Sequence, residues 1–274
     1  MRLFVNHRTE YRFSEPQRRL IQMLRVTPPS YAGQQIVGWQ IDVQCDACLI
    51  PGSDGFGNET AMLYVEGPVD QLSLTISGEA LIENRLGIVE GAPEPLPPLV
   101  YLRSTALTKP TPAITELARQ VEAAKTDVIA RLHRLTSEIY EGMQFDSYQD
   151  DADRDAGTAF EEKHGVCQDY AHIFIAAARE MEIPARYVSG HLYRSDVTGA
   201  QPAAHAWAEA YIQDLGWVGF DPANDMCPDD AYIRVAVGLD YRDAAPLSGT
   251  RRGGGSESLS VSVSVSQAQV QTQN

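Results

Sequence analysis

Cysteine is scarce in this sequence, with four residues among 274. Cys45 and Cys48 form a C-x-x-C pair, whereas Cys167 and Cys227 each stand alone. Because no second C-x-x-C follows, a four-cysteine zinc site is excluded, and so few thiols in a chain of this length argue against a disulfide scaffold. The C-x-x-C pair is better interpreted as a strand running into a turn. A zinc site that combines Cys45 and Cys48 with Cys227 is kept as a hypothesis.

Long apolar segments and an excess of basic charge are also missing. No run of about 18 apolar residues occurs, and residues 1–17 lack the apolar stretch of a secretory signal, so we predict a cytoplasmic location. The 37 acidic side chains outnumber the 22 basic ones, which gives a net charge of -15. A charge of this sign repels nucleic acid. We therefore expect neither a membrane nor nucleic acid as a partner.

Alternating apolar and polar residues, interrupted by turn residues, dominate the first part of the chain. This pattern predicts an N-terminal antiparallel β-sandwich over residues 1–92. Residues 93–112 are rich in proline, which fits neither a helix nor a central strand, and are predicted to be a linker. Apolar residues then recur at helical spacing before alternation returns, which predicts an α+β core over residues 113–245, with helices first and an antiparallel sheet after them. Alternating valine and serine within residues 246–274 predict a C-terminal strand that returns to a sheet, followed by a tail.

The segment GVCQDYAHIFIAAAREMEIP places Cys167 at the start of a predicted helix. The residues after Tyr170 are good helix formers, and Pro184 ends the run. Unpaired backbone N–H groups and the positive end of the helix dipole favour a thiolate there, and the thiolate is the nucleophilic form of cysteine. The same N–H groups would lie where an acyl oxyanion develops. Cys167 is therefore the candidate nucleophile, with a buried structural cysteine as the alternative.

Of the six histidines, only His205 stands in a context that fixes its ring. In the strand AHAWAEAYI, alternation puts alanines on one face, where a helix can pack closely, and His205 with Trp207 on the other, where they could form the wall of a site. The next strand, WVGFDPA, ends at Asp221. If Tyr211 faces Trp217, Asp221 becomes a diagonal neighbour of His205, within reach of a side-chain hydrogen bond. We therefore predict that His205 is the general base and that Asp221 orients its ring.

The remaining candidate residues carry weaker signals. His164, three residues before Cys167, is the alternative base, although it is more simply a loop residue. His191 and Trp207 are the predicted substrate contacts. The acidic segment 146–155 lacks the sixth-position glycine and the terminal glutamate of a calcium loop. It is interpreted as a solvated loop, and no metal or cofactor is expected.

Several blocks of sequence occur together in one order. They are GVCQDYAH at 165–172, IPARYVSGHL at 183–192, HAWAEAYIQDLGWVGFDPAN at 205–224 and VAVGLDYRDAAPLSG at 235–249. With these blocks, the sequence resembles a bacterial transglutaminase-like protein with its dedicated N-terminal domain, over essentially the whole chain. The resemblance implies a papain-like transglutaminase core with a triad at Cys167, His205 and Asp221, preceded by a β-sandwich. One position departs from the family pattern, because His191 stands where a tyrosine is common.

These residues predict a cysteine-dependent acyl-transfer enzyme that acts on an amide or peptide bond through a thioester, with a peptide or protein as substrate. Hydrolysis, as in a peptidase or amidase, is the favoured outcome. Transamidation, which cross-links protein glutamine to an amine, is the alternative within the same chemistry. A non-catalytic peptide-binding or assembly module is the alternative of another class, motivated by the separate β domain and the strand-forming tail.

Overall fold

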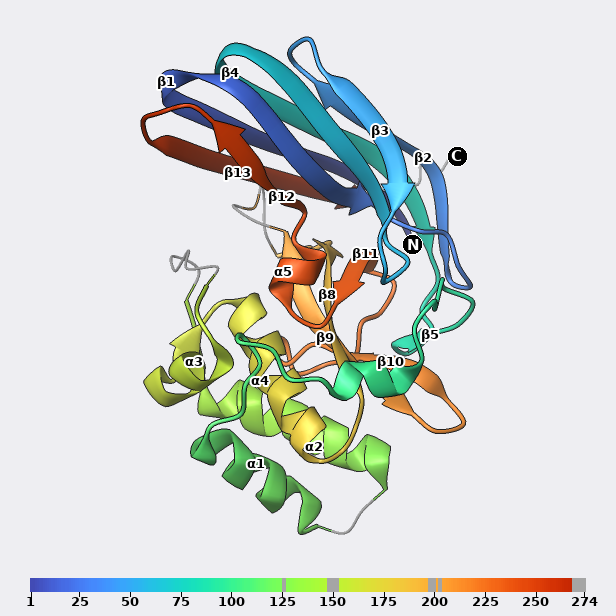
Figure 1. The fold of residues 1–274 in the computed structure, drawn as a ribbon. Coiled ribbons are helices and arrows are strands. Elements are labelled where there is room, and N and C mark those ends of the chain that lie inside the picture. Colours follow the sequence, from blue (N-terminus) through green and yellow to red (C-terminus); the bar gives the residue numbers. More distant parts are fainter. Residues whose placement is uncertain (125–126, 147–152, 197–200, 202–203, 268–274) are drawn as a thin grey trace, which may run out of the picture.

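The computed structural model of the chain describes residues 1–124, 127–146, 153–196, 201 and 204–267. Two large antiparallel sheets, a small two-stranded one and a group of helices make up the described part of the fold, so the predicted α+β class is confirmed (Figure 1). A six-stranded sheet lies at one end of the molecule and most of the helices at the other, with a five-stranded sheet between them. Within the described residues, no helix is long and apolar enough to cross a membrane.

The six-stranded sheet is built around two long strands that pair along most of their length. Its members are β1 (Arg2–Thr27), β2 (Gln34–Val43), β3 (Cys48–Ser53), β4 (Glu59–Ile82), β12 (Leu247–Arg252) and β13 (Glu257–Gln267). β2 and β3 pair with different halves of β4, and β13 and β12 pair with different halves of β1. The sheet therefore has two four-stranded halves that share β1 and β4. Leu20 and Leu63 from one half join Leu72 and Leu74 from the other in one apolar core, as a β-sandwich requires.

β1 continues through Pro16. Proline has no N–H to donate to a neighbouring strand. The pairing of β1 with β4 shifts register between Arg12 and Gln17, and again before Arg19. In this bulged stretch Pro16 does not have to donate a hydrogen bond to the neighbouring strand, and so β1 does not end there.

The C-terminal segment returns to the N-terminal sheet. β13 pairs with β1 from Leu3 to Phe13, which confirms the predicted return of the serine- and valine-rich strand to a sheet. The short strand β12, which precedes it, was not predicted and pairs with the second half of β1. The two ends of the chain are therefore held in one sheet.

The five-stranded sheet has the order β11-β8-β9-β10-β5. Its strands are β5 (Ile88–Val89), β8 (Ala185–Leu192), β9 (His205–Ile212), β10 (Gly216–Phe220) and β11 (Tyr232–Gly238). On one face of β9 the small side chains of Ala206, Ala208 and Ala210 share a core with a helix, as the alternation predicts. Small residues allow this close approach of helix and strand.

Helices cover that face of the sheet (Figure 1). They are α1 (Pro112–Glu122), α2 (Val128–Gly142), α3 (Ala156–Glu162) and α4 (Cys167–Glu180), with a short α5 (Tyr241–Ala244) and a 3₁₀ helix η1 (Pro98–Leu102) elsewhere. α4 packs against α1, α2, α3 and β9, and its central residues Ile173, Phe174 and Ile175 are fully buried. Each such side chain contributes roughly 1.5–3 kcal/mol on burial, so α4 is a rigid base for its own first residue.

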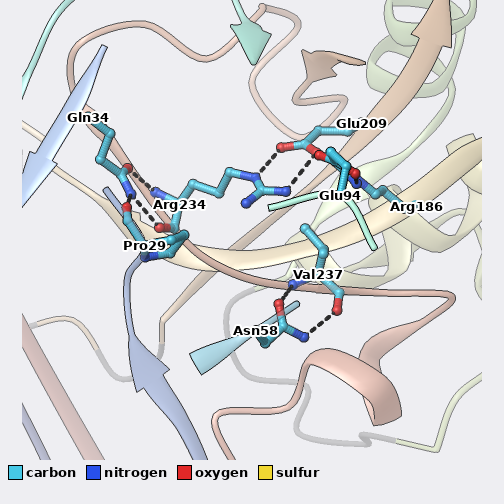
Figure 2. Close-up of polar contacts among 8 residues, drawn as sticks. All are labelled: Pro29, Gln34, Asn58, Glu94, Arg186, Glu209, Arg234 and Val237. Carbon is cyan, nitrogen blue, oxygen red and sulfur yellow. Dashed lines mark hydrogen bonds and ion pairs between the residues drawn. The ribbon is translucent and has the colours of Figure 1, made fainter. Parts of the chain in front are cut away.

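The second face of the five-stranded sheet carries a buried cluster of charges. Glu209 of β9 pairs with Arg186 of β8 and with Arg234 of β11, and Arg186 also pairs with Glu94 (Figure 2). Arg186, Glu209 and Arg234 are each at least 95 % buried. Opposite charges that satisfy one another in this way tie three neighbouring strands together at side-chain level.

Candidate active site

Cys167 is the first residue of α4, as the sequence predicts. Val166 precedes the helix in an extended conformation, and its N–H donates to Oδ2 of Asp169 at 2.9 Å. Gly165 lies so close that a Cβ there would be 2.4 Å from the same oxygen. The Asp169 carboxylate therefore ties the first helical turn to the chain before it, which fixes the position of Cys167. The Cys167 side chain is partly exposed.

β9 and β10 bring His205 and Asp221 together in the predicted register. Tyr211 pairs with Trp217, and the ladder ends one residue before Asp221. Nε2 of His205 lies 2.6 Å from Oδ2 of Asp221. The expected side-chain hydrogen bond between these diagonal neighbours is present.

Asp221 is fully buried, and its carboxylate is surrounded by donors. Oδ2, the oxygen that faces His205, also accepts from Nδ2 of Asn224 at 2.7 Å and from the hydroxyl of Tyr232 at 2.8 Å. Oδ1 accepts from the backbone N–H of Ala223 at 3.0 Å. Burial alone would raise the pKa of Asp221, but the charge of His205 and these hydrogen bonds lower it. The carboxylate is therefore ionised and cannot rotate freely.

The Cys167 thiol and the Asp221 carboxylate together determine the pKa and the orientation of the His205 ring. Burial by itself lowers the pKa of His205, but the charges of Asp221 and Cys167, and hydrogen bonds to both, raise it to about 10. His205 is therefore an imidazolium at neutral pH. Because Asp221 holds Nε2, the other ring nitrogen, Nδ1, is the one available to the sulfur.

These groups lie in an order that suits acyl transfer. Cys167 supplies a partly exposed sulfur at a helix start, where backbone N–H groups can stabilise an oxyanion. His205, with 12 % of its side chain exposed, can give and take a proton beside that sulfur. The Asp221 side chain has no exposed surface, so it could reach the reacting groups only through His205.

The face of β9 that carries Trp207 is largely buried. Trp207 is 2 % exposed, and its ring centroid lies 6.1 Å from that of His205 and 5.4 Å from that of Tyr232. The indole is almost completely buried, so the structure does not support a substrate contact by Trp207, which stays a prediction. Trp207 instead supports the His205 ring from its buried side.

His191 lies between the two sheets rather than at the edge of a pocket. It is 3 % exposed, and its ring meets that of His7 of β1 edge-on at a centroid distance of 5.7 Å. Burial lowers the pKa of His191 to about 3, with a further contribution from the charge of His7. The neutral ring is enclosed, so the structure does not support a substrate contact by His191 either, and that contact stays a prediction.

His164, the alternative base, lies in a two-residue strand, β7 (His164–Gly165), which pairs in parallel with β6 (Gln144–Phe145). Its ring nitrogens lie 3.9 Å from the Asp146 carboxylate and 3.7 Å from that of Glu162. His205, by contrast, bonds to Asp221, and its pKa is raised by the charge of Cys167. This difference favours His205 as the base.

The zinc hypothesis is not supported. Cys45 packs against the core of the six-stranded sheet, whereas Cys227 packs against the core that α4 shares with the five-stranded sheet. Among the described residues, no group of three or more His, Cys, Asp or Glu side chains could hold a metal ion. Residues 147–152 of the acidic segment 146–155 lie outside the described residues.

Asn224 and Tyr232 belong to the site but were not predicted. Asn224 follows Asp221 by three residues, inside the block FDPAN, and a turn after a proline could have pointed to it. Tyr232 opens β11, and nothing in the local sequence signals its contact with Asp221. That contact arises only when β11 takes its place in the sheet.

Two family profiles match the chain. The profile of the transglutaminase-like superfamily matches residues 115–222, and that of the bacterial transglutaminase-like N-terminal region matches residues 3–81. The first range contains Cys167, His205 and Asp221.

Similar proteins are found in several bacteria. An uncharacterized protein of Mycobacterium tuberculosis is 29% identical over 280 residues, which cover 89% of this chain and 86% of that protein. A protein-glutamine gamma-glutamyltransferase of Pseudomonas aeruginosa is 31% identical over 107 residues, 34% of this chain and 15% of that protein. A solved structure from Cytophaga hutchinsonii, assigned as a candidate cysteine protease, has a TM-score of 0.79 at 20% identity and shares the fold over 100% of this chain and 92% of its own. The chain belongs to the transglutaminase-like superfamily and carries the bacterial transglutaminase-like N-terminal region.

Proposed function

We propose that the chain is a cysteine-dependent acyl-transfer enzyme that hydrolyses an amide or peptide bond through a thioester. The observation that carries this proposal is that the His205 ring is held by Asp221 at 2.6 Å and interacts with Cys167 at the start of α4. A cysteine that only fills space needs no charged imidazole beside it. A peptide or protein is the substrate class that this chemistry implies.

In the first half of the reaction, the Cys167 sulfur attacks the carbonyl carbon of the amide. A carbon–sulfur bond forms, and the carbonyl oxygen becomes an oxyanion that the N–H groups at the start of α4 stabilise. His205 then gives its proton to the amine nitrogen, the carbon–nitrogen bond breaks, and the amine leaves. The products are a free amine and an acyl group bound to Cys167 as a thioester.

In the second half, the neutral His205 takes a proton from water, whose oxygen attacks the thioester carbon. The carbon–sulfur bond breaks, the acid is released, and the sulfur regains its negative charge beside the imidazolium. Throughout both halves Asp221 keeps the same ring orientation and stabilises the charged ring. No other group has to change its protonation state.

Transamidation is the alternative outcome of the same thioester. It requires a primary amine in place of water, and its support here is the likeness of part of the chain to a protein-glutamine gamma-glutamyltransferase. The deciding experiment incubates the protein with peptide libraries, with and without a primary amine, and follows the products by mass spectrometry. We expect cleavage with a gain of water, and no reaction with Cys167→Ala. Preferential incorporation of the amine would replace hydrolysis by transamidation.

A matched control uses another partly buried thiol. Burial raises the pKa of Cys227 to about 11, so Cys227→Ala should react like the parent protein.

A non-catalytic binding module remains the competing class, and the rate of iodoacetamide labelling against pH decides it. Labelling of Cys167 that is fast at pH 6 and slow in His205→Ala supports catalysis. Labelling that rises only near about pH 8.5, as for an ordinary thiol, overturns the proposal.

A further inference from the structure

Tyr232 contacts both the acid and the base of the proposed triad. Its side chain is 5 % exposed, and its hydroxyl donates to Oδ2 of Asp221 at 2.8 Å. Its ring centroid lies 5.8 Å from that of His205, and the Trp207 ring packs edge-on against it. Burial and the negative charge of Asp221 raise the pKa of Tyr232, so the hydroxyl keeps its proton and remains a donor.

This hydroxyl binds the oxygen that matters for His205. Oδ2 of Asp221 is bonded to Nε2 of His205. The other donors to this oxygen, such as the Tyr232 hydroxyl, limit how far the carboxylate can rotate. Asn224 is the other side-chain donor to Oδ2, but it is exposed, so water can replace it. Tyr232 is buried, and its hydrogen bond cannot be exchanged for one to solvent without opening the sheet.

β11, which begins at Tyr232, is the last strand of its sheet, and within the described residues no further strand pairs with its outer edge. Gln34 of β2 covers this edge (Figure 2). Its Oε1 accepts from the backbone N–H of Arg234 at 2.8 Å, and its Nε2 donates to the backbone carbonyl of the same residue at 2.8 Å. The amide of Gln34 thus replaces a neighbouring strand, at a position two residues from Tyr232. Gln34 is 2 % exposed and belongs to the N-terminal sheet.

The side chain of Arg234 extends this connection toward β9. Its Nε donates to Oε1 of Glu209 at 2.7 Å, and Glu209 lies four residues from His205 on the same strand. The N-terminal sheet therefore reaches the triad by a chain of buried contacts that runs along β11. These contacts hold β11 in register with the strand that carries His205.

We propose that Tyr232 is a positioning residue of the triad, and that Gln34 of the N-terminal sheet holds Tyr232 against Asp221 by fixing the edge of β11. The inference rests on the proposed function and deepens it, because it makes the N-terminal sheet part of the machinery that orients His205. In this role Tyr232 orients the Asp221 carboxylate and packs beside the His205 ring, and it neither forms a bond to the substrate nor transfers a proton.

The test is a direct titration of the His205 ring by nuclear magnetic resonance in the full-length protein. The titratable groups that face this ring are Cys167, Asp221 and Tyr232. Tyr232→Phe should lower the midpoint of the His205 titration by about one pH unit, because the carboxylate is no longer held toward the ring. Gln34→Met should shift it in the same direction by a smaller amount. Labelling of Cys167 by iodoacetamide at pH 6 should slow in parallel.

Asn58 provides the matched control. Its side chain makes the same pair of hydrogen bonds to the backbone of Val237, at 2.7 and 2.8 Å, farther along the same strand (Figure 2). Asn58→Leu should lower stability and leave the His205 titration unchanged. An unchanged or raised midpoint in Tyr232→Phe overturns the role of Tyr232, and equal shifts in Gln34→Met and Asn58→Leu overturn the role of Gln34.

The titration separates this inference from the proposed function because it needs no turnover. A parent protein that cleaves nothing, with the expected shifts in the variants, refutes the enzyme and keeps the positioning role. If the parent cleaves a substrate but the variants lack those shifts, the enzyme proposal is kept and the positioning role is refuted. Should Gln34→Met fail to fold, Gln34→Glu keeps the acceptor for the Arg234 N–H, loses the donor, and serves as the second variant.

Discussion

Arg186 lies over the ring of Trp217, with 3.8 Å between its guanidinium carbon and the ring centroid, and its side chain has no exposed surface. The guanidinium also donates to Glu209 at 2.7 Å and to Glu94 at 2.6 Å. A cation that is buried this completely is tolerated because an aromatic ring and two carboxylates compensate it. This arrangement makes the charge cluster sensitive to the loss of any one partner.

Glu209→Gln should destabilise the protein strongly. The change leaves the guanidinium groups of Arg186 and Arg234 buried with one anion fewer, and breaking a buried ion pair of this kind costs about 3–5 kcal/mol. The free energy of unfolding from urea titration measures the effect. Glu116→Gln, which removes an exposed ion pair to Arg119, is the matched control and should resemble the parent. Equal losses in the two variants would contradict this reading of the cluster.

Gly165→Ala should disable Cys167 while the fold persists. The new Cβ would lie 2.4 Å from Oδ2 of Asp169 and 2.8 Å from its Cβ, so this side chain must move and its hydrogen bond to the Val166 N–H is lost. We expect labelling of Cys167 at pH 6 to slow by roughly tenfold or more, with a loss of about 1–3 kcal/mol of stability from overpacking.

Gly142→Ala is the control for this change. Gly142 ends α2, and no atom of the described residues lies within 4 Å of a Cβ built there. Its labelling rate should equal that of the parent, and its stability should be unchanged or slightly higher, because alanine favours helices over glycine. A Gly165→Ala variant that labels like Gly142→Ala would show that the Asp169 contact does not position the thiol.

The sequence predicted the helix start at Cys167 and the contact between His205 and Asp221 because the signals for both are local. Cys167 is marked by a helix start, and the facing of His205 and Asp221 follows from the two-residue period of two strands joined by a short turn. These signals require knowledge only of neighbouring residues, and the structure has the same helix start and the same register.

The misses come from packing between distant parts of the chain. Alternation correctly placed Trp207 and His191 on strands, but it could not show that these faces are covered. His191 meets His7, which is 184 residues earlier in the chain, and Gln34 reaches Arg234 across 200 residues. Tyr232 was missed for the same reason, because its contact with Asp221 depends on how β11 docks at the sheet edge.

Asp221→Asn should move the alkaline limit of activity to lower pH. Burial lowers the pKa of His205, and the charge of Asp221 is the first of the interactions that raise it to about 10. Removal of that charge while a hydrogen-bonding side chain is kept should shift the alkaline limb of kcat/KM down by about two pH units and reduce kcat by on the order of 10³-fold. The pH–rate profile on an amide substrate measures both effects.

Asp225→Asn controls for the loss of a negative charge nearby. Asp225 is exposed and accepts a hydrogen bond from Ser137 of α2 instead of from His205. The pH–rate profile of Asp225→Asn should follow that of the parent on both its acidic and its alkaline limb. If the alkaline limb stays in place in Asp221→Asn, the carboxylate does not stabilise the imidazolium.

His7→Gln should make the protein less sensitive to acid. Burial lowers the pKa of His7 to about 4, below the value of 6.5 expected when the chain is unfolded, so between these values the unfolded chain binds more protons. Stability is therefore lost as pH falls from 6.5 toward 4, by roughly 3 kcal/mol for this residue, and His7 contributes nothing to the slope above pH 6.5. A glutamine amide can still bond to Oγ1 of Thr9, which lies 3.1 Å from Nε2 of His7, while it cannot take up a proton. Urea unfolding at a series of pH values should give a shallower decline for the variant below pH 6.5 and parallel curves above it. Parallel curves over the whole range would show that folding does not lower the pKa of His7.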